Sequence, residues 1–251
     1  MRLNVFLQRA GVGSRREAER LIEDGRVTIN GRVAKVTTPA EDGDIIKVNG
    51  KLVSPATKSL PRLFMLHKPV DILVTNQDPQ GRPTVFELPA LTPPLWDATM
   101  PRVMNIGRLD VNSEGLLLFS SDGPLAQAMM SPQTALERTY RVRVHGRLTP
   151  KNLEDLAQGV TVDGINYRGL EITEEREPSG ANTWYKLVLT EGKNREIRRL
   201  MEHFGCIVSR LIRTQYGPFH LGDLPMGKIV EIHPREVRDL ISDLEKRGIK
   251  I

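Results

Sequence analysis

The sequence is poor in the residues that build covalent and metal-based frameworks. It has a single cysteine, Cys206, which excludes an internal disulfide and is typical of a reducing compartment. Its 5 histidines lie far apart and lack the closely spaced Cys or His pairs of a zinc site, so no metal is expected. A Gly-rich phosphate loop is also missing, which argues against nucleoside triphosphate or nicotinamide chemistry. We therefore expect this protein to work without a cofactor.

Long apolar runs are missing as well. No stretch approaches the roughly 20 apolar residues of a membrane helix. Residues 1–10 lack the basic and apolar regions of a secretory signal. These absences predict a cytoplasmic protein with no membrane partner.

What the sequence does contain is a modest excess of positive charge over a length suited to two domains. The 251 residues carry 36 Lys and Arg against 31 Asp and Glu, a net charge of +5, and the sequence pI is about 9.4. This balance is compatible with a polyanionic partner, but many basic proteins bind no nucleic acid. Charge alone therefore leaves the partner open.

Residues 1–53 have the pattern of a small domain of helices and hairpins. Apolar residues at helical spacing precede a glycine break, and Ser14 with Glu17 then forms a capping box that starts a second helix. The pairs Asn30-Gly31 and Asn49-Gly50 each lie between short apolar runs and predict tight hairpins. The segment 54–61, rich in proline and small polar residues, predicts a linker.

Arginines lie on or beside the two predicted helices: Arg9, Arg15, Arg16, Arg20 and Arg26. The planar guanidinium suits phosphate contacts, so these residues are candidate RNA ligands. They are equally typical of a solvated helix face, because glutamates nearby on the helix compensate their charge. The residues by themselves do not decide between the two interpretations.

Residues 62–251 predict a larger α+β domain, because strand-like runs are interrupted by single helices, a pattern that favours a mainly antiparallel sheet. Strands are expected at 63–66, 115–119, 140–144, 184–189 and 229–232, and helices at 124–130, 150–158, 194–204 and 234–246.

The stretch 105–123 carries the candidate chemistry. Asp110 lies on a predicted loop ahead of a buried strand, with Arg108 two residues before it. A carboxylate held by a rigid strand in this way suits a nucleophile or a base. The same pattern fits an aspartate that stabilises its own turn. A hydrolase using Asp110 with Glu114 would need two carboxylates at a defined separation, which this spacing does not guarantee.

Residues 1–50 resemble the RNA-binding domain first described in a small-subunit ribosomal protein, notably in Gly13 to Ala18 and Val27 to Gly31. Gly107-Arg108-Leu109-Asp110, followed by residues 113–118, resembles the catalytic motif of the pseudouridine synthases that act on ribosomal RNA. Segments 66–69, 137–142 and 191–200 agree with that family in order and spacing. The resemblance covers nearly the whole chain. It implies the pseudouridine synthase fold and isomerisation of a uridine within RNA.

The resemblance also implies roles for individual residues. Asp110 is the expected nucleophile, Lys193 the basic residue paired with it, and Tyr140 the ring against the target base. Arg108 is expected to enter the space left by the flipped base. Independently of the resemblance, Arg195, Arg198 and Arg199 lie near the start of a predicted helix and are candidates to meet phosphates. Without the resemblance, Tyr140 reads as a half-buried strand residue and Lys193 as a solvated turn residue.

The sequence departs from the broader family pattern at two places, and the second of them indicates a branch of the family. Asp71 stands where many relatives have glycine, and Arg195-Glu196 stands where many have His-Gln. The second departure resembles the branch that modifies large-subunit (23S) ribosomal RNA, so that RNA or a pre-ribosomal particle is the expected partner of a monomeric enzyme. The alternatives are a synthase acting on small-subunit (16S) RNA and a non-catalytic ribosome-assembly factor. Relatives on this branch often carry a basic C-terminal tail, whereas this sequence stops at Ile251, so the tail is either absent or trimmed.

Overall fold

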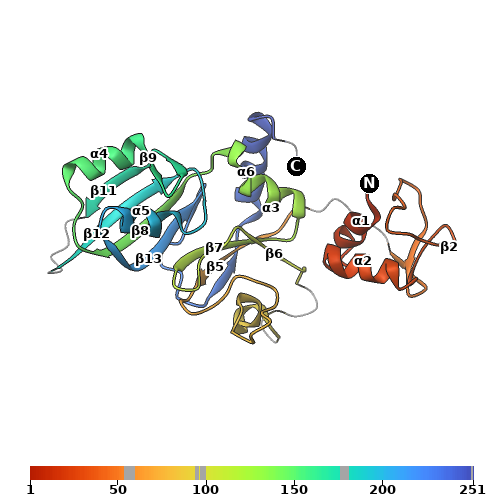
Figure 1. Cartoon of the computed structure of the whole chain (residues 1–251). Helices are drawn as coiled ribbons and strands as arrows, with labels where there is room; N and C mark the ends of the chain where they lie inside the picture. The colour runs from red at the N-terminus through yellow and green to blue at the C-terminus, as the bar shows by residue number, and fades with distance from the viewer. Residues whose placement is uncertain (54–59, 94–95, 97–99, 176–180, 250) are drawn as a thin grey trace. The chain divides into compact units, whose positions relative to one another are not determined.

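The computed structural model describes residues 1–53, 60–93, 96, 100–175, 181–249 and 251. The chain divides into two compact units, Met1–Pro61 and Arg62–Ile251, which are described separately (Figure 1). Most of the predicted linker, residues 54–59, lies outside the described residues. In the described part of the chain, no helix has the length and apolar character needed to cross a membrane.

The first unit packs two helices on a small antiparallel sheet. Helices α1 (Leu3–Arg9) and α2 (Arg15–Glu23) precede strands β1 (Val27–Ile29), β2 (Arg32–Val33), β3 (Ile46–Val48) and β4 (Lys51–Val53), which lie in the order β2-β1-β3-β4. The predicted capping box is confirmed: Ser14 Oγ accepts the Glu17 N–H at 3.2 Å, and the Glu17 carboxylate accepts the Ser14 N–H at 2.6 Å.

Both predicted hairpins of this unit are confirmed. Asn30 and Gly31 have φ of 50° and 81°, and Asn49 and Gly50 have φ of 50° and 77°. Two consecutive residues with positive φ make the tight turn whose twist matches the flanking strands, and Asn-Gly is the pair that adopts it at least cost. Alternate strand residues then point inward to meet the apolar faces of the two helices.

The second unit is an α+β domain around one large, mainly antiparallel sheet, as the sequence predicted. The main strands are β5 (Leu63–Lys68), β6 (Met104–Ile106), β7 (Glu114–Ser120), β8 (Arg138–His145), β11 (Glu171–Glu175), β12 (Asn182–Leu189), β13 (Ile207–Tyr216), β14 (Phe219–His220) and β15 (Ile229–Glu231). Their order is β11-β12-β8-β13-β7-β5-β15, with β14 beside β13 and β6 beside β7. The contact between β7 and β13 is parallel, and it joins the two halves of the sheet.

Helices cover the sheet at separate places. They are α3 (Gly123–Met130), α4 (Pro150–Gln158), α5 (Glu196–His203) and α6 (Pro234–Lys246), with short 3₁₀ turns at Val85–Glu87, Pro89–Leu91 and Pro132–Thr134 and a small hairpin of β9 (Gly159–Val162) and β10 (Ile165–Arg168). Helix α4 packs on β11 and α5 on β13 (Figure 1). A core of side chains from α4, α5, β8 and β12 fixes this end of the sheet, and a second core lies against β5 and β7.

Candidate active site

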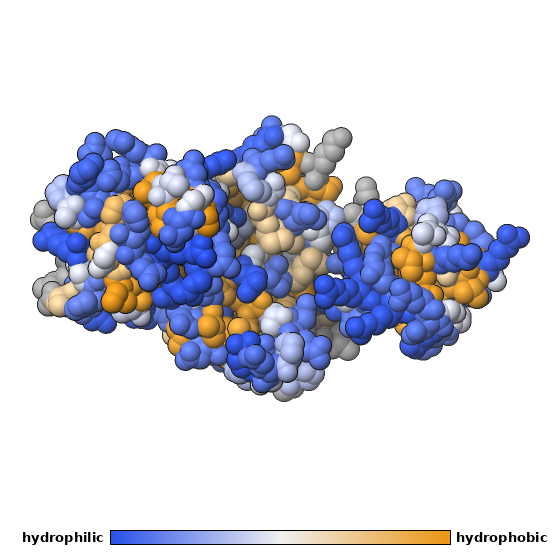
Figure 2. Space-filling model, viewed as in Figure 1, coloured by the Kyte–Doolittle hydropathy of each residue, from blue (hydrophilic) through white to orange (hydrophobic). Residues whose placement is uncertain are grey.

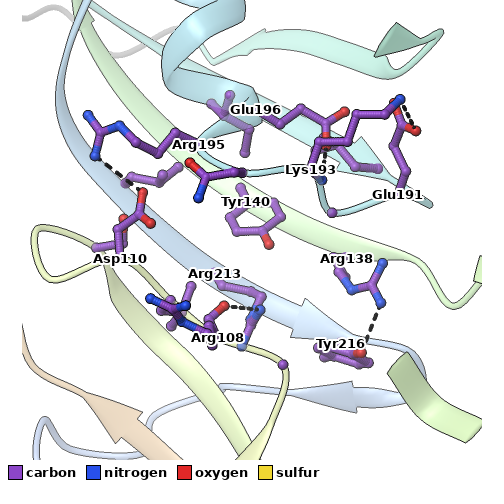
Figure 3. Close-up of a pocket in the computed structure, with 18 of the residues that line it drawn as sticks. Arg108, Asp110, Arg138, Tyr140, Glu191, Lys193, Arg195, Glu196, Arg213 and Tyr216 are labelled. Atoms are coloured by element: carbon purple, nitrogen blue, oxygen red, sulfur yellow. Dashed lines mark hydrogen bonds and ion pairs between the residues drawn. The ribbon is translucent and has the colours of Figure 1, made fainter. Parts of the chain in front are cut away.

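A cleft of about 910 Å³ opens where the end of β6, the loop before β7, strand β8, the segment after β12 and the start of α5 come together. It collects most of the residues that the sequence singled out in the large unit (Figure 3). Its charged lining side chains are Arg108, Asp110, Arg138, Arg168, Glu191, Lys193, Arg195, Glu196, Arg198 and Arg213. The surface over α5 and β13 is largely hydrophilic (Figure 2). The balance of seven basic against three acidic side chains favours an anionic ligand.

The loop that carries Asp110 is held from below by a buried lysine. Lys68 is 0% exposed, and its Nζ donates to the carbonyls of Pro69 at 2.8 Å, Asp110 at 3.2 Å, Val111 at 3.4 Å and Ser113 at 2.8 Å. Burial lowers the pKa of Lys68 to about 8, although the charge of Asp110 opposes the shift. The ammonium group fastens the main chain on both sides of the carboxylate, so the loop is rigid before any ligand binds.

Asp71 supports the same loop from a neighbouring turn. Its N–H donates to the carbonyl of Val111 at 2.8 Å. Its φ is 61°, a left-handed conformation that glycine adopts freely and aspartate tolerates. The departure from glycine at this position is thus compatible with the same backbone geometry.

Gly115 allows β13 to approach the Asp110 loop. It pairs with Arg213 across the parallel contact of β7 and β13, and its φ is 107°. A Cβ atom here would lie 2.3 Å from the Arg213 carbonyl oxygen, closer than real contacts allow. Glycine is therefore required at this point of the motif.

Two arginines of the α5 region face the carboxylate of Asp110. Arg195 Nη1 lies 3.6 Å and Arg198 Nε 3.9 Å from Asp110 Oδ2. The Arg198 side chain is 13% exposed against 48% for Arg195, and its guanidinium also donates to the carbonyls of Asn112 at 2.9 Å and Val208 at 3.3 Å. Burial, followed by the charge of Arg195, lowers the pKa of Arg198. Arg198 is the better fixed of the two cations.

Lys193 lies in the same cleft but has a different partner from the one expected. Its Nζ donates to Glu191 Oε2 at 2.6 Å and to the carbonyl of Asn166 at 2.7 Å, and it lies 5.3 Å from the centre of the Tyr167 ring. The structure does not show the expected pairing of Lys193 with Asp110, whose carboxylate faces Arg195 and Arg198 instead. The Lys193 side chain is 36% exposed in the segment before α5, and Glu191 fixes its position.

Glu191 and Glu196 form an acidic pair behind Lys193. Glu196 is 4% exposed, and its Oε2 accepts the N–H of Lys193 at 2.9 Å. Burial, with the adjacent charge of Glu191, raises the pKa of Glu196 to about 7. Burial also opposes ionisation of Glu191, but hydrogen bonds from Lys193 and the N–H of Arg168 outweigh it and lower the Glu191 pKa. Of the two carboxyl groups, Glu196 is therefore the one that favours the protonated form.

Tyr140 presents its ring to the middle of the cleft (Figure 3). It is half-buried and packs against both apolar cores of the unit. Its neighbours across the sheet are Leu187 on β12 and Arg213 on β13. Arg108 is exposed at the cleft wall, and its carbonyl accepts a hydrogen bond from Arg213 Nη1 at 3.4 Å.

Glu114 does not serve as a second carboxylate beside Asp110. It is 3% exposed, pairs with Arg210, and is not among the residues that line the cleft. The structure therefore gives no support to the hydrolase alternative.

Sequence reasoning assigned no role to Arg138, Arg213 or Tyr216, which form one wall of the cleft. Arg213 is 2% exposed within the long strand β13. An arginine in the middle of a buried strand is a signal of function that the sequence offers. It could not be used here, because strand β13 was not predicted.

The predicted phosphate-binding arginines of the first unit lie mostly on α2. Arg15, Arg16 and Arg20 are exposed there, as a phosphate-binding face requires. Arg9 ends α1, and its side chain is outside the described part of the chain.

Comparison with known proteins identifies the family. Residues 62–203 match the model for RNA pseudouridylate synthase, and residues 1–46 match the S4 domain. The ribosomal large subunit pseudouridine synthase B of Pseudomonas aeruginosa is 41% identical over 99% of this chain, which spans 63% of that protein. The protein of the same name from Escherichia coli K12 is 44% identical over 90% of this chain and 75% of its own length.

Two further matches cover almost the full length of both this chain and the protein it is compared with. An uncharacterized RNA pseudouridine synthase of Rickettsia typhi is 41% identical over 96% of each chain. A solved structure described as a pseudouridylate synthase has a TM-score of 0.66 at 24% identity and covers 96% of this chain and 99% of its own, which shows the common fold. With the family model matching more than half of its residues, this chain belongs to the RNA pseudouridylate synthase family.

Proposed function

We propose that this protein converts uridine to pseudouridine at a specific position in large-subunit ribosomal RNA, with Asp110 as the nucleophile. The relatives named above as large-subunit synthases support the substrate. The observation that carries the chemistry is the rigid placement of the Asp110 carboxylate in a basic cleft beside Arg198 and the Tyr140 ring. The small-subunit RNA remains the alternative substrate.

The reaction is an isomerisation in which no atom is gained or lost. The target uridine leaves its stack and enters the cleft, at a cost of a few kcal/mol. Asp110 attacks either the sugar or the base, the bond from the ribose to the ring nitrogen breaks, and the uracil turns. A bond from the same ribose carbon to a ring carbon then forms, and that ring carbon loses its proton while the ring nitrogen gains one.

The surrounding side chains have separate tasks in this proposal. Arg198 stabilises the negative charge of Asp110 before the attack and again when the covalent bond breaks and its electron pair returns to the carboxylate. Tyr140 stacks on the extruded base, and its hydroxyl is within the cleft to assist removal of the proton from carbon. Arg108 fills the space that the base leaves in the RNA. Lys193 acts through Glu191 and the Asn166 carbonyl on β10, and it is a positioning residue.

The first unit supplies affinity rather than chemistry. The exposed arginines of α2 suit the phosphates of structured RNA, as the S4 match suggests. An isomerisation consumes no oxidant, reductant or co-substrate, so we expect no cofactor. All the groups assigned a role come from one chain, which is compatible with a monomer, and the proposed substrate places the reaction in the cytoplasm.

The test is pseudouridine mapping in unmodified large-subunit ribosomal RNA incubated with wild-type protein or Asp110→Asn, with small-subunit RNA as a control. We expect new pseudouridine at one site in the large-subunit RNA with the wild type and none with the variant, while both bind the RNA equally. Product formed by Asp110→Asn would exclude the nucleophile. Product formed in the small-subunit RNA alone would show that this RNA, and not the large-subunit RNA, is the substrate. Tight binding without product in either RNA would favour an assembly factor.

A further inference from the structure

Arg138 and Arg213 are two buried arginines on the wall of the cleft, and the reaction proposed above does not use them. Arg138 is 9% exposed and Arg213 is 2% exposed, and both line the cleft. A buried guanidinium normally pairs with a carboxylate, because an uncompensated buried charge costs several kcal/mol. Among the described residues neither arginine has a carboxylate within 4.0 Å.

The hydrogen bonds of these two arginines leave much of their capacity unused. Arg138 donates to the carbonyl of Thr190 at 3.3 Å and to the Tyr216 hydroxyl at 2.9 Å. Arg213 donates to the carbonyls of Leu116 at 2.7 Å and Arg108 at 3.4 Å. The Arg213 Nη2 atom is buried and has no partner in the described part of the chain. A guanidinium has five N–H donors, so protein acceptors satisfy fewer than half of them.

The Tyr216 ring holds both guanidiniums together. Their central carbons lie 4.7 Å (Arg138) and 5.2 Å (Arg213) from the centre of that ring. The hydroxyl accepts a hydrogen bond from Arg138 (Figure 3). It in turn donates to the Met129 carbonyl at 3.0 Å, and the two bonds fix the ring. An aromatic face stabilises a cation but cannot neutralise it.

The register of β8 and β13 produces this arrangement. Tyr140 lies opposite Arg213, but a bulge between Arg213 and Gln215 brings Tyr216 opposite Arg138. Residues directly opposite in an antiparallel pair share a face of the sheet, and a bulge redirects a side chain in this way. If the same residues paired in regular register, without the bulge, Gln215 would lie opposite Arg138. The bulge therefore builds the pair of arginines beside the ring of Tyr140.

The acidic side chains of the cleft are already engaged elsewhere. Asp110 faces Arg195 and Arg198, and Glu191 is paired with Lys193. The buried Glu196 accepts the N–H of Lys193. No carboxylate of the cleft is left to neutralise Arg138 and Arg213, so their charge is available to an incoming anion.

We infer that Arg138 and Arg213 form a subsite for one phosphodiester of the RNA backbone, next to the nucleotide whose base meets Tyr140. Arg138 donates to the phosphate oxygens, and Arg213 adds positive charge from behind it. Arg138 and Tyr140 are two residues apart on β8, about 7 Å, so both reach the same nucleotide or its neighbour. The inference rests on the proposed function in one respect, namely that RNA enters this cleft.

The experiment measures affinity of the full-length protein for a short single-stranded RNA with one central uridine, by fluorescence anisotropy over a range of salt concentrations. For Arg138→Gln we expect about tenfold weaker binding. We also expect the slope of log affinity against log salt to fall by about 0.7, the value for one lost phosphate contact on a single strand. Arg138→Lys should keep the slope. The matched control is Arg147→Gln, which removes an equal charge from an exposed arginine paired with Glu174 outside the cleft.

Neutral methylphosphonate linkages, introduced one at a time into the same RNA, locate the phosphate. One linkage beside the central uridine should weaken binding to the wild type and have a much smaller effect on Arg138→Gln, because the direct contact is already lost and only the charge of Arg213 remains. An unchanged salt slope in Arg138→Gln, or additive effects at every linkage, would overturn the subsite. If the Arg138→Gln variant does not fold, the wild-type protein alone tests the inference. Equal affinity for every methylphosphonate RNA would then overturn the phosphate subsite.

Pseudouridine formation is measured separately, so the two proposals can fail independently. Product formation with a flat methylphosphonate scan would remove only the phosphate subsite. Coupling between one linkage and Arg138 without any product would support the subsite and contradict the proposed reaction.

Discussion

Replacing Glu196 with glutamine should change how the stability of the large unit depends on pH. Glu196 is 4% exposed, and burial together with Glu191 raises its pKa to about 7. Glutamine has the same shape as the neutral acid, and its side-chain oxygen accepts the N–H of Lys193 in the same way. The variant therefore removes the titration with little change in packing.

The sign and size follow from the pKa. Below about pH 4.5 the Glu196 carboxyl is neutral in both the folded and the unfolded chain, so the stability that its raised pKa contributes is fully present. As the pH rises the unfolded chain loses this proton first, and the contribution is lost as the pH passes through about 7. A rise from 4.5 to about 7 corresponds to about 3 kcal/mol of unfolding free energy. We expect Glu196→Gln to lie within about 1 kcal/mol of the wild type at about pH 5 and to exceed it by about 3 kcal/mol at about pH 8.

Denaturant unfolding followed by tryptophan fluorescence measures this directly, because both tryptophans, Trp96 and Trp184, lie in the large unit. The control is Glu202→Gln on the exposed face of α5, which should stay within about 0.5 kcal/mol of the wild type at both pH values. The reasoning is refuted if Glu196→Gln differs from the wild type by the same amount at pH 5 and pH 8.

Two other substitutions test the geometry of the active-site loop. Gly115→Ala places a Cβ atom 2.3 Å from a backbone oxygen of β13. Thermal unfolding should therefore show a loss of more than about 3 kcal/mol in unfolding free energy. The control, Gly164→Ala, has a φ of 75° and open space around the new Cβ atom, and should lose only about 1 kcal/mol. Equal losses would show that β7 and β13 separate freely. Arg198→Gln should slow single-turnover formation of pseudouridine at least tenfold more than Arg195→Gln, because Arg198 is the more buried of the two cations facing Asp110. Equal rates in the two variants would contradict that ranking.

Local signals in the sequence were sufficient for most of the elements. The predicted helices at 150–158 and 234–246 agree with α4 and α6 at both ends, because a capping residue and a proline mark each start. The helix predicted from residue 194 begins at Glu196 instead, since Arg195 adopts a left-handed conformation with φ of 51°. The long strand β13 was not predicted, because its polar residues give no clear alternation and its place between β8 and β7 depends on distant partners.

The sequence by itself determined the α+β class, the small first unit with its two Asn-Gly hairpins, and the motif that carries Asp110, while RNA binding by the first unit came from its resemblance to a known domain. These features depend on short-range rules of capping, turn geometry and spacing, or on a motif long enough to be specific. Only the tertiary structure decided which cations face Asp110. They are Arg195 and Arg198, and not Lys193. It also built the pair of Arg138 and Arg213 around one tyrosine. The physical reason is that ion pairs and buried charges depend on strand register, a bulge and the parallel contact at Gly115, none of which is encoded within a single short segment.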